Sequence, residues 1–112
     1  MTAMDAAERT AGTVRLRIVM PHQLRALARV TGEVAVEAAA PVTVRTALDA
    51  LEAAHPALVG TIRKRDTGQR RAMIRIYAAG EDLSNAPVDT LLPAIVTSGH
   101  EPLQLVGAIA GG

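Results

Sequence analysis

The chain has 112 residues, no cysteine and a net charge of +1, which fits a single domain. Without cysteine it has no disulfide framework, no cysteine zinc site and no thiol nucleophile. Because its net charge is near zero, the protein has no strong overall electrostatic field that would attract nucleic acid or an anionic membrane. Tyr77 is the one aromatic residue, so Val, Leu, Ile, Met and Ala must build the core.

Residues 1–12 are small, polar and aperiodic, and we expect them to form a disordered N-terminal tail. They contain no apolar stretch of the kind found in secretory signals. No apolar run in the chain is long enough to span a bilayer. The lack of cysteine fits a reducing compartment. The sequence therefore predicts a cytoplasmic protein with no membrane partner.

Two strands are predicted by apolar residues that alternate with polar ones, at residues 14–20 and 34–38. The outward positions of the first strand carry arginine, at Arg15 and Arg17. Those of the second carry glutamate, with Glu33 just before the strand and Glu37 within it. Antiparallel pairing would set these opposite charges against each other, at about 0.2–1 kcal/mol per pair.

The clearest helix follows Pro41 and spans residues 43–55. Thr43 is its expected N-cap, and apolar residues recur every three or four positions, which predicts that Leu48 and Leu51 are buried. Pro56 ends the helix near His55. The connection between the first two strands, residues 21–32, is predicted only as a long link that ends in a Thr31-Gly32 turn.

The rest of the chain predicts a charged loop at 63–71, a strand within 73–79 and a turn-rich connector at 80–88. A short apolar element is expected at 91–96, and a last strand at 103–106. This order of elements, with one helix across a mixed sheet, is an α+β arrangement of the β-grasp (ubiquitin-like) kind. We expect residues 13–107 to form this domain and residues 108–112 to form a flexible tail.

The most informative motif is the terminal pair Gly111-Gly112. Glycine has no Cβ, so a diglycine can lie extended in a narrow channel and offers an unhindered acyl group. ATP would convert the Gly112 carboxylate into an acyl-adenylate. Sulfide or a persulfide can then displace the adenylate to give a thiocarboxylate. The alternative interpretation is a frayed terminus of small residues, because a terminal Gly-Gly alone is a weak signal.

From about Val14 to Gly112 the sequence resembles the MoaD/ThiS family of sulfur carriers, and within it the CysO-like branch. The resemblance lies in residues 21–25, 31–32, 43–52, 55–58, 80–82, 88–92 and 108–112. It implies that an E1-like, ATP-dependent enzyme adenylates Gly112 and that a downstream synthase accepts the sulfur. The protein itself would be a carrier with no catalytic residue, no metal and no bound cofactor, and ATP would be used by its partner.

The tail residues Ile109, Ala110 and Gly111 are then expected to be recognised by the activating enzyme. Leu103 and Leu105 are expected to lie where that enzyme docks. The sequence departs from the family pattern at Ala78-Ala79, at residues 98–102 and at Gly107, where relatives often have proline. These departures lie near the expected partner-binding edge and bear on which partner binds.

Three other functions have weaker support. The cationic residues of the 63–71 loop lack the interleaved aromatic residues of a nucleic-acid groove, so we expect a solvated loop that assists docking at most. The three histidines, His22, His55 and His100, lack metal-ligand spacing. Ser84 and Ser98 lack the sequence context of a hydrolase.

Two hypotheses therefore remain for the function. The first is a sulfur carrier, which is a substrate of other enzymes. The second is a β-grasp interaction module without sulfur chemistry. They differ in whether Gly112 has a free carboxylate that an enzyme activates.

Overall fold

The computed structural model describes residues 12–107. Its elements, in chain order, are β1 (Thr13–Val19), α2 (His22–Ala28), β2 (Val34–Ala39), α3 (Val44–Ala54), the 3-10 turn η1 (Pro56–Leu58), β3 (Ile74–Ala78), β4 (Glu81–Asp82), α4 (Ala94–Thr97) and β5 (Leu103–Gly107). The predicted N-terminal tail therefore lies outside the described residues, apart from Gly12. Among residues 12–107, no helix has the length and apolarity needed to cross a membrane.

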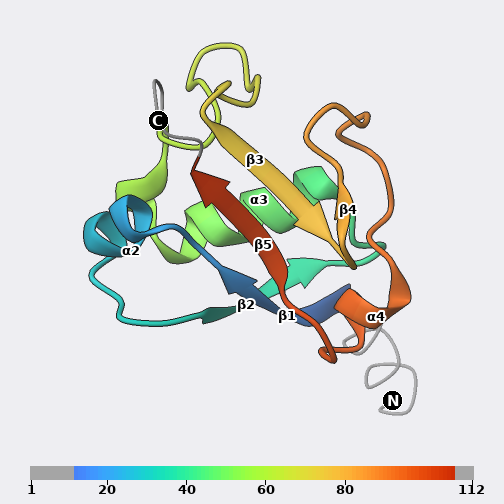
Figure 1. Ribbon diagram of the computed structural model, residues 1–112. Coiled ribbons are helices and arrows are strands. Elements are labelled where there is room, and N and C mark those ends of the chain that lie inside the picture. The colour runs from blue at the N-terminus through green and yellow to red at the C-terminus, as the bar shows by residue number, and fades with distance from the viewer. Residues whose placement is uncertain (1–11, 108–112) are drawn as a thin grey trace.

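The five strands form one mixed sheet in the order β2-β1-β5-β3-β4. The β1 and β5 strands are parallel, and the other neighbouring pairs are antiparallel. The main helix, α3, lies across one face of this sheet (Figure 1). Among the described elements, no helix of comparable length covers the opposite face (Figure 1), and we call it the open face. The predicted β-grasp fold is confirmed.

A single apolar core fills the space between α3 and the sheet. Alternate residues of each strand point into it, as the period of two predicts, and α3 contributes Leu48 and Leu51 as expected. The side chains that are most completely buried include Leu16, Ile18, Met20, Leu51, Leu58, Ile62, Ile76, Val96, Leu103 and Leu105. Aliphatic side chains thus build the core without help from an aromatic residue.

The predicted helix cap is present at the start of α3. The Thr43 hydroxyl accepts a hydrogen bond from the Thr46 N–H at 3.1 Å, and the Thr43 N–H donates to the Thr46 hydroxyl at 2.8 Å. This reciprocal pair satisfies two backbone donors that an uncapped helix would leave free. The helix ends at Ala54, one residue before the predicted end, with His55 as its C-cap and Pro56 following.

The connection between β1 and β2 differs from the prediction, because it contains the short helix α2. Leu24, Leu27 and Ala28 do have helical spacing, but the helix is only seven residues long and only Leu24 is buried. Arg29 ends the helix in the left-handed conformation, at φ 60°. The predicted connector at 80–88 also contains a short element, the strand β4. The short apolar element expected at 91–96 is present as the helix α4, which extends to Thr97.

Candidate functional site

The β5 strand, which precedes the predicted tail at 108–112, lies in the middle of the sheet. It is flanked by β1 on one side and by β3 on the other, and Gly107 pairs with Ile74. At its last residue, Gly107, this strand is held by its pairing with β3, because β1 pairs only with Leu103 and Gln104 at the start of β5. Residues 108–112 lie outside the described part of the chain. The roles predicted for Ile109, Ala110, Gly111 and Gly112 therefore remain predictions.

The beginning of α2 flanks the base of the tail. A Cβ placed on Gly107 would lie 3.4 Å from the Pro21 Cβ and 3.7 Å from the Gln23 Oε1 atom. These are ordinary van der Waals contacts, so the space at Gly107 is narrow but not closed. The fold thus brings residues 21–25, one of the stretches that carry the family resemblance, against the end of β5.

The two leucines expected at the docking surface are in the core instead. Leu103 is 0% exposed and Leu105 is 2% exposed, because both point from β5 toward α3. The prediction that these side chains contact a partner is therefore corrected. Successive side chains of a strand point to opposite faces, so the residues that β5 presents to solvent are Gln104 and Val106.

An exposed apolar site lies on the open face close to the base of the tail. Val106 is 43% exposed and pairs with Arg75 of β3, and Met73, just before β3, is also exposed. Pro21 and Gly107 lie at the same end of the sheet. Sequence reasoning could have found Val106 and Gln104, because the alternation that buries the two leucines leaves these residues outside.

Ion pairs cover much of the rest of the open face. Arg15 lies 3.8 Å from Glu37, and the Arg17 Nε lies 2.7 Å from a carboxylate oxygen of Glu33. The predicted pairing of arginines with glutamates across β1 and β2 is confirmed. The hydrogen bond from Arg17 lowers the pKa of the Glu33 carboxyl below its ordinary value. Glu33 therefore stays ionised at neutral pH, and its negative charge is neutralised by the guanidinium of Arg17.

A third ion pair joins β3 and β4 on the same face. The Arg75 guanidinium contacts the Asp82 carboxylate, and the Ser84 N–H donates to Asp82 Oδ1 at 2.9 Å. Hydrogen bonds from Ser84, followed by those from Arg75, hold the pKa of Asp82 well below its ordinary value. The Ser84 hydroxyl is itself fixed, because it accepts a hydrogen bond from the Ile76 N–H at 2.8 Å.

Two arginines of the cationic loop at 63–71 bond to other parts of the domain. Arg63 bonds to both Asp49 and Glu52 of α3 at 2.9 Å. Arg70 donates to the backbone carbonyl oxygens of Ser84 and Ile74, at 2.8 Å and 2.7 Å. These guanidiniums join the loop to α3 and to the start of β3. The loop is therefore more structural than the predicted solvated loop.

A metal site or a catalytic triad among the described residues would require histidine, acidic or serine side chains that lie close together. No group of three or more acidic or histidine side chains within residues 12–107 is placed to hold a metal ion. The Ser98 hydroxyl does lie 2.8 Å from His100 Nδ1, a contact that the sequence did not suggest. No described carboxylate hydrogen-bonds to His100, and both residues are exposed, so the arrangement of a catalytic triad is not met.

No protein-family model and no curated protein sequence matches the chain. Solved structures do match it. Small archaeal modifier protein 1 from Haloferax volcanii has a TM-score of 0.68 and 28% identity, over 88% of this chain and 99% of that chain. The protein of the same name from Methanosarcina acetivorans has a TM-score of 0.67 and 18% identity, over 89% and 98% of the two chains.

A chain of the Amycolatopsis orientalis BexX/CysO complex also matches, with a TM-score of 0.64 and 22% identity over 86% of this chain and 98% of that chain. The two matches below 25% identity show the shared fold. In each case almost the whole of the solved chain is covered, so the similarity extends over the complete β-grasp domain. The chain is thus similar in structure to small ubiquitin-like proteins.

Proposed function

We propose that this protein is a sulfur carrier of the CysO-like branch of the MoaD/ThiS family. The observation that carries the proposal is the β-grasp domain that this chain shares with small archaeal modifier protein 1 and with a chain of the BexX/CysO complex. The sequence adds the Gly111-Gly112 pair, which follows the end of the central strand β5 by only a few residues. The tail is the part that reacts, and the folded domain is the part that partners recognise.

The chemistry takes place at the C-terminal carboxylate of Gly112. An oxygen of that carboxylate attacks the α-phosphorus of ATP, which forms the acyl-adenylate and releases pyrophosphate. Sulfide then attacks the acyl carbon, and AMP leaves as the C–S bond forms. The resulting thiocarboxylate delivers sulfur to a downstream synthase. An E1-like enzyme supplies the ATP site, so the carrier needs no cofactor and no catalytic side chain of its own.

The geometry of the domain is consistent with a tail that reacts and a folded domain that binds the activating enzyme. Residues 108–112 can span at most about 17 Å when extended, so the activating enzyme must bind the domain close to its own ATP site. Val106, Met73 and Pro21 lie at the base of the tail, where such an enzyme would make contact. A carrier must also leave its partner to deliver sulfur, so we expect a transient interface of modest size on the open face.

A second function, as a protein modifier, is favoured by the similarity to small archaeal modifier protein 1 from Haloferax volcanii. It would begin with the same acyl-adenylate. An amine would then displace AMP in place of sulfide, and Gly112 would become joined to a lysine through an amide. The two functions therefore share the activating step and differ in the nucleophile that follows.

Intact-protein mass spectrometry tests the proposal. The carrier is incubated with an E1-like enzyme, ATP and sulfide, and the expected result is a mass gain equal to the replacement of one oxygen by sulfur, on the C-terminal peptide. Gly112→Ala should fold normally but react far more slowly, and deletion of Gly112 should abolish the gain. A covalent adduct on an amine would instead indicate a modifier. No ATP-dependent change with an active enzyme would favour a β-grasp interaction module without sulfur chemistry.

A further inference from the structure

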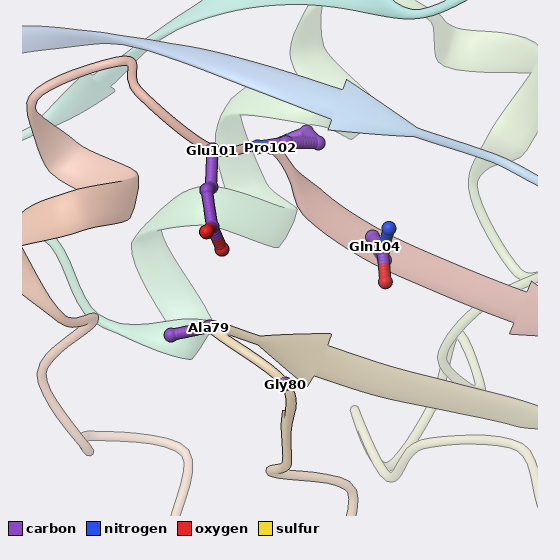
Figure 2. A pocket seen from close by; sticks show the side chains of 5 residues that line it. All are labelled: Ala79, Gly80, Glu101, Pro102 and Gln104. Carbon is purple, nitrogen blue, oxygen red and sulfur yellow. The ribbon is translucent and has the colours of Figure 1, made fainter.

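A polar hollow of about 420 Å³ opens at the end of the sheet opposite to the base of the tail. It lies between the turn that joins β3 to β4 and the segment that enters β5. Its lining residues are Ala79, Gly80, Glu101, Pro102 and Gln104. Figure 2 shows the Glu101 carboxylate and the Gln104 carboxamide pointing into the space across from Ala79 and Gly80.

Backbone contacts fix both walls of the hollow. On one side, Ala79 and Gly80 both have positive φ angles, of 53° and 78°, and the β3–β4 pairing closes their turn. On the other side, the Glu101 N–H donates to the Ile95 carbonyl at 3.0 Å, and Gln104 is paired with Tyr77. The hollow is therefore bounded by paired backbone and belongs, through Gln104, to the open face.

The charge of Glu101 is not compensated within residues 12–107. The nearby guanidinium of Arg17 donates to the Gly99 and His100 carbonyls, at 3.0 and 3.1 Å, but its ion pair is with Glu33. On the other side of the hollow, Arg75 is paired with Asp82. No described ion pair includes Glu101. The hollow therefore offers one free carboxylate and one carboxamide oxygen, with no cation of its own.

We propose that this hollow receives an arginine side chain of the enzyme that docks on the open face. The inference rests on the proposed carrier function. A guanidinium matches the site because its planar fork can donate to the Glu101 carboxylate and to the Gln104 carboxamide at once. The hollow has room for such a group. Its position beside Gln104 makes it continuous with the surface that leads to the tail.

Two of the stretches in which the sequence departs from the family pattern meet at the hollow. Ala79 belongs to one departing stretch, and Glu101 and Pro102 belong to another. The two stretches lie about twenty residues apart in the chain, and the fold brings them together as opposite walls of this one site. A surface site that carries an unpaired charge is suited to selecting a partner of opposite charge.

A titration followed by NMR tests the site without any partner enzyme. The full chain is titrated with N-acetyl-arginine methylamide, and with the neutral isostere N-acetyl-citrulline methylamide as the matched probe. We expect saturable shifts at the amides of Ala79, Gly80, Glu101 and Gln104 with the arginine probe alone. Glu101→Gln should weaken this binding about tenfold. Glu81→Gln removes an exposed acid that does not line the hollow, and should leave the binding unchanged.

Four results would overturn the proposal, the second and third of which concern binding of the arginine probe. One is an equal response to the citrulline probe, which would show that charge does not direct binding. The second is Glu101→Gln binding the arginine probe as wild type does, and the third is no saturable shift in either protein. The fourth is a shift of the same amides with protein concentration alone, which would assign the hollow to contact between copies of this chain.

The kinetics of activation separate this inference from the carrier function itself. With an E1-like enzyme that thiocarboxylates wild type, Glu101→Gln should raise the carrier concentration at half-maximal rate about tenfold and leave kcat unchanged. Wild-type kinetics in that variant would overturn the docking inference and leave the carrier function standing. If wild type is not thiocarboxylated at all, the carrier function fails, and the probe titration still decides whether the hollow binds a guanidinium.

Discussion

The two faces of the sheet differ in what their side chains do. The face under α3 is apolar throughout and buries residues such as Ile18, Leu51 and Leu103. The open face carries ion pairs between neighbouring strands and leaves Val106 and Glu101 without partners of that kind. The covered face therefore determines the fold, and the few open-face residues that the ion pairs do not use are the ones available for recognition.

The largest effect should come from a cavity on the covered face. Leu51 is fully buried beneath the sheet, so Leu51→Ala should reduce the free energy of unfolding by about 2–5 kcal/mol. Denaturant unfolding measures the change. The matched control, Leu91→Ala, truncates a leucine that is mostly exposed, and should cost less than about 0.5 kcal/mol. Similar losses for both leucines would contradict the assignment of α3 to the core.

A smaller effect is expected for the ion pairs at the edge of α3. The side chains of Arg63 and Glu52 are only 16% and 14% exposed, and Asp49 bonds to the same guanidinium. Arg63→Met leaves Glu52 without its cation and should cost about 1–3 kcal/mol. Arg15→Met breaks the well-exposed pair with Glu37 and should cost at most about 1 kcal/mol. Equal costs in urea unfolding would show that burial does not distinguish the two pairs.

The cap of α3 should contribute about 1 kcal/mol. Thr43→Ala removes the hydroxyl that accepts from the Thr46 N–H, so a backbone donor of the first turn loses its partner. Thr43→Ser keeps the hydroxyl and serves as the control, with a stability close to that of wild type. If thermal unfolding shows the serine variant to be as unstable as the alanine variant, the hydroxyl is not the source of the stabilisation.

The smallest effect concerns the pH dependence of the open face. The folded pKa of Asp82 is below its unfolded value, so its contribution is present above the unfolded pKa and is lost as pH falls through the folded one. Stability should therefore decline between about pH 5 and pH 2 more steeply in wild type than in Asp82→Asn. Parallel pH profiles for the two proteins would contradict a lowered pKa at Asp82.

The residues of the covered face could be predicted from the sequence because buried side chains recur at regular intervals, every second residue in a strand and every third or fourth in a helix. Alternation located the strands, and the spacing of Leu48 and Leu51 located the core side of α3. The helix α2 was missed because it buries one side chain only. Its seven residues span only about two turns, which is too short for apolar spacing to distinguish a helix from a loop.

The candidate site was harder to predict than the fold. Leu103 and Leu105 were expected to contact a partner, but their alternating positions on β5 place both side chains in the core. In a strand with one buried face, the alternating apolar residues belong to that face and not to the docking surface. The hollow beside Glu101 joins two segments that are distant in the chain. Its existence depends on strand order, which local patterns do not contain.

The separation of docking from chemistry can be measured directly in the rate of thiocarboxylate formation by an E1-like enzyme. Val106→Lys changes the open face and should raise the carrier concentration at half-maximal rate, with kcat unchanged. Gly112→Ala changes the reacting end and should lower kcat severely. The central claim is that the open face binds and the tail reacts. It would be contradicted if Val106→Lys had no effect on either constant, or if Gly112→Ala were activated at the wild-type rate.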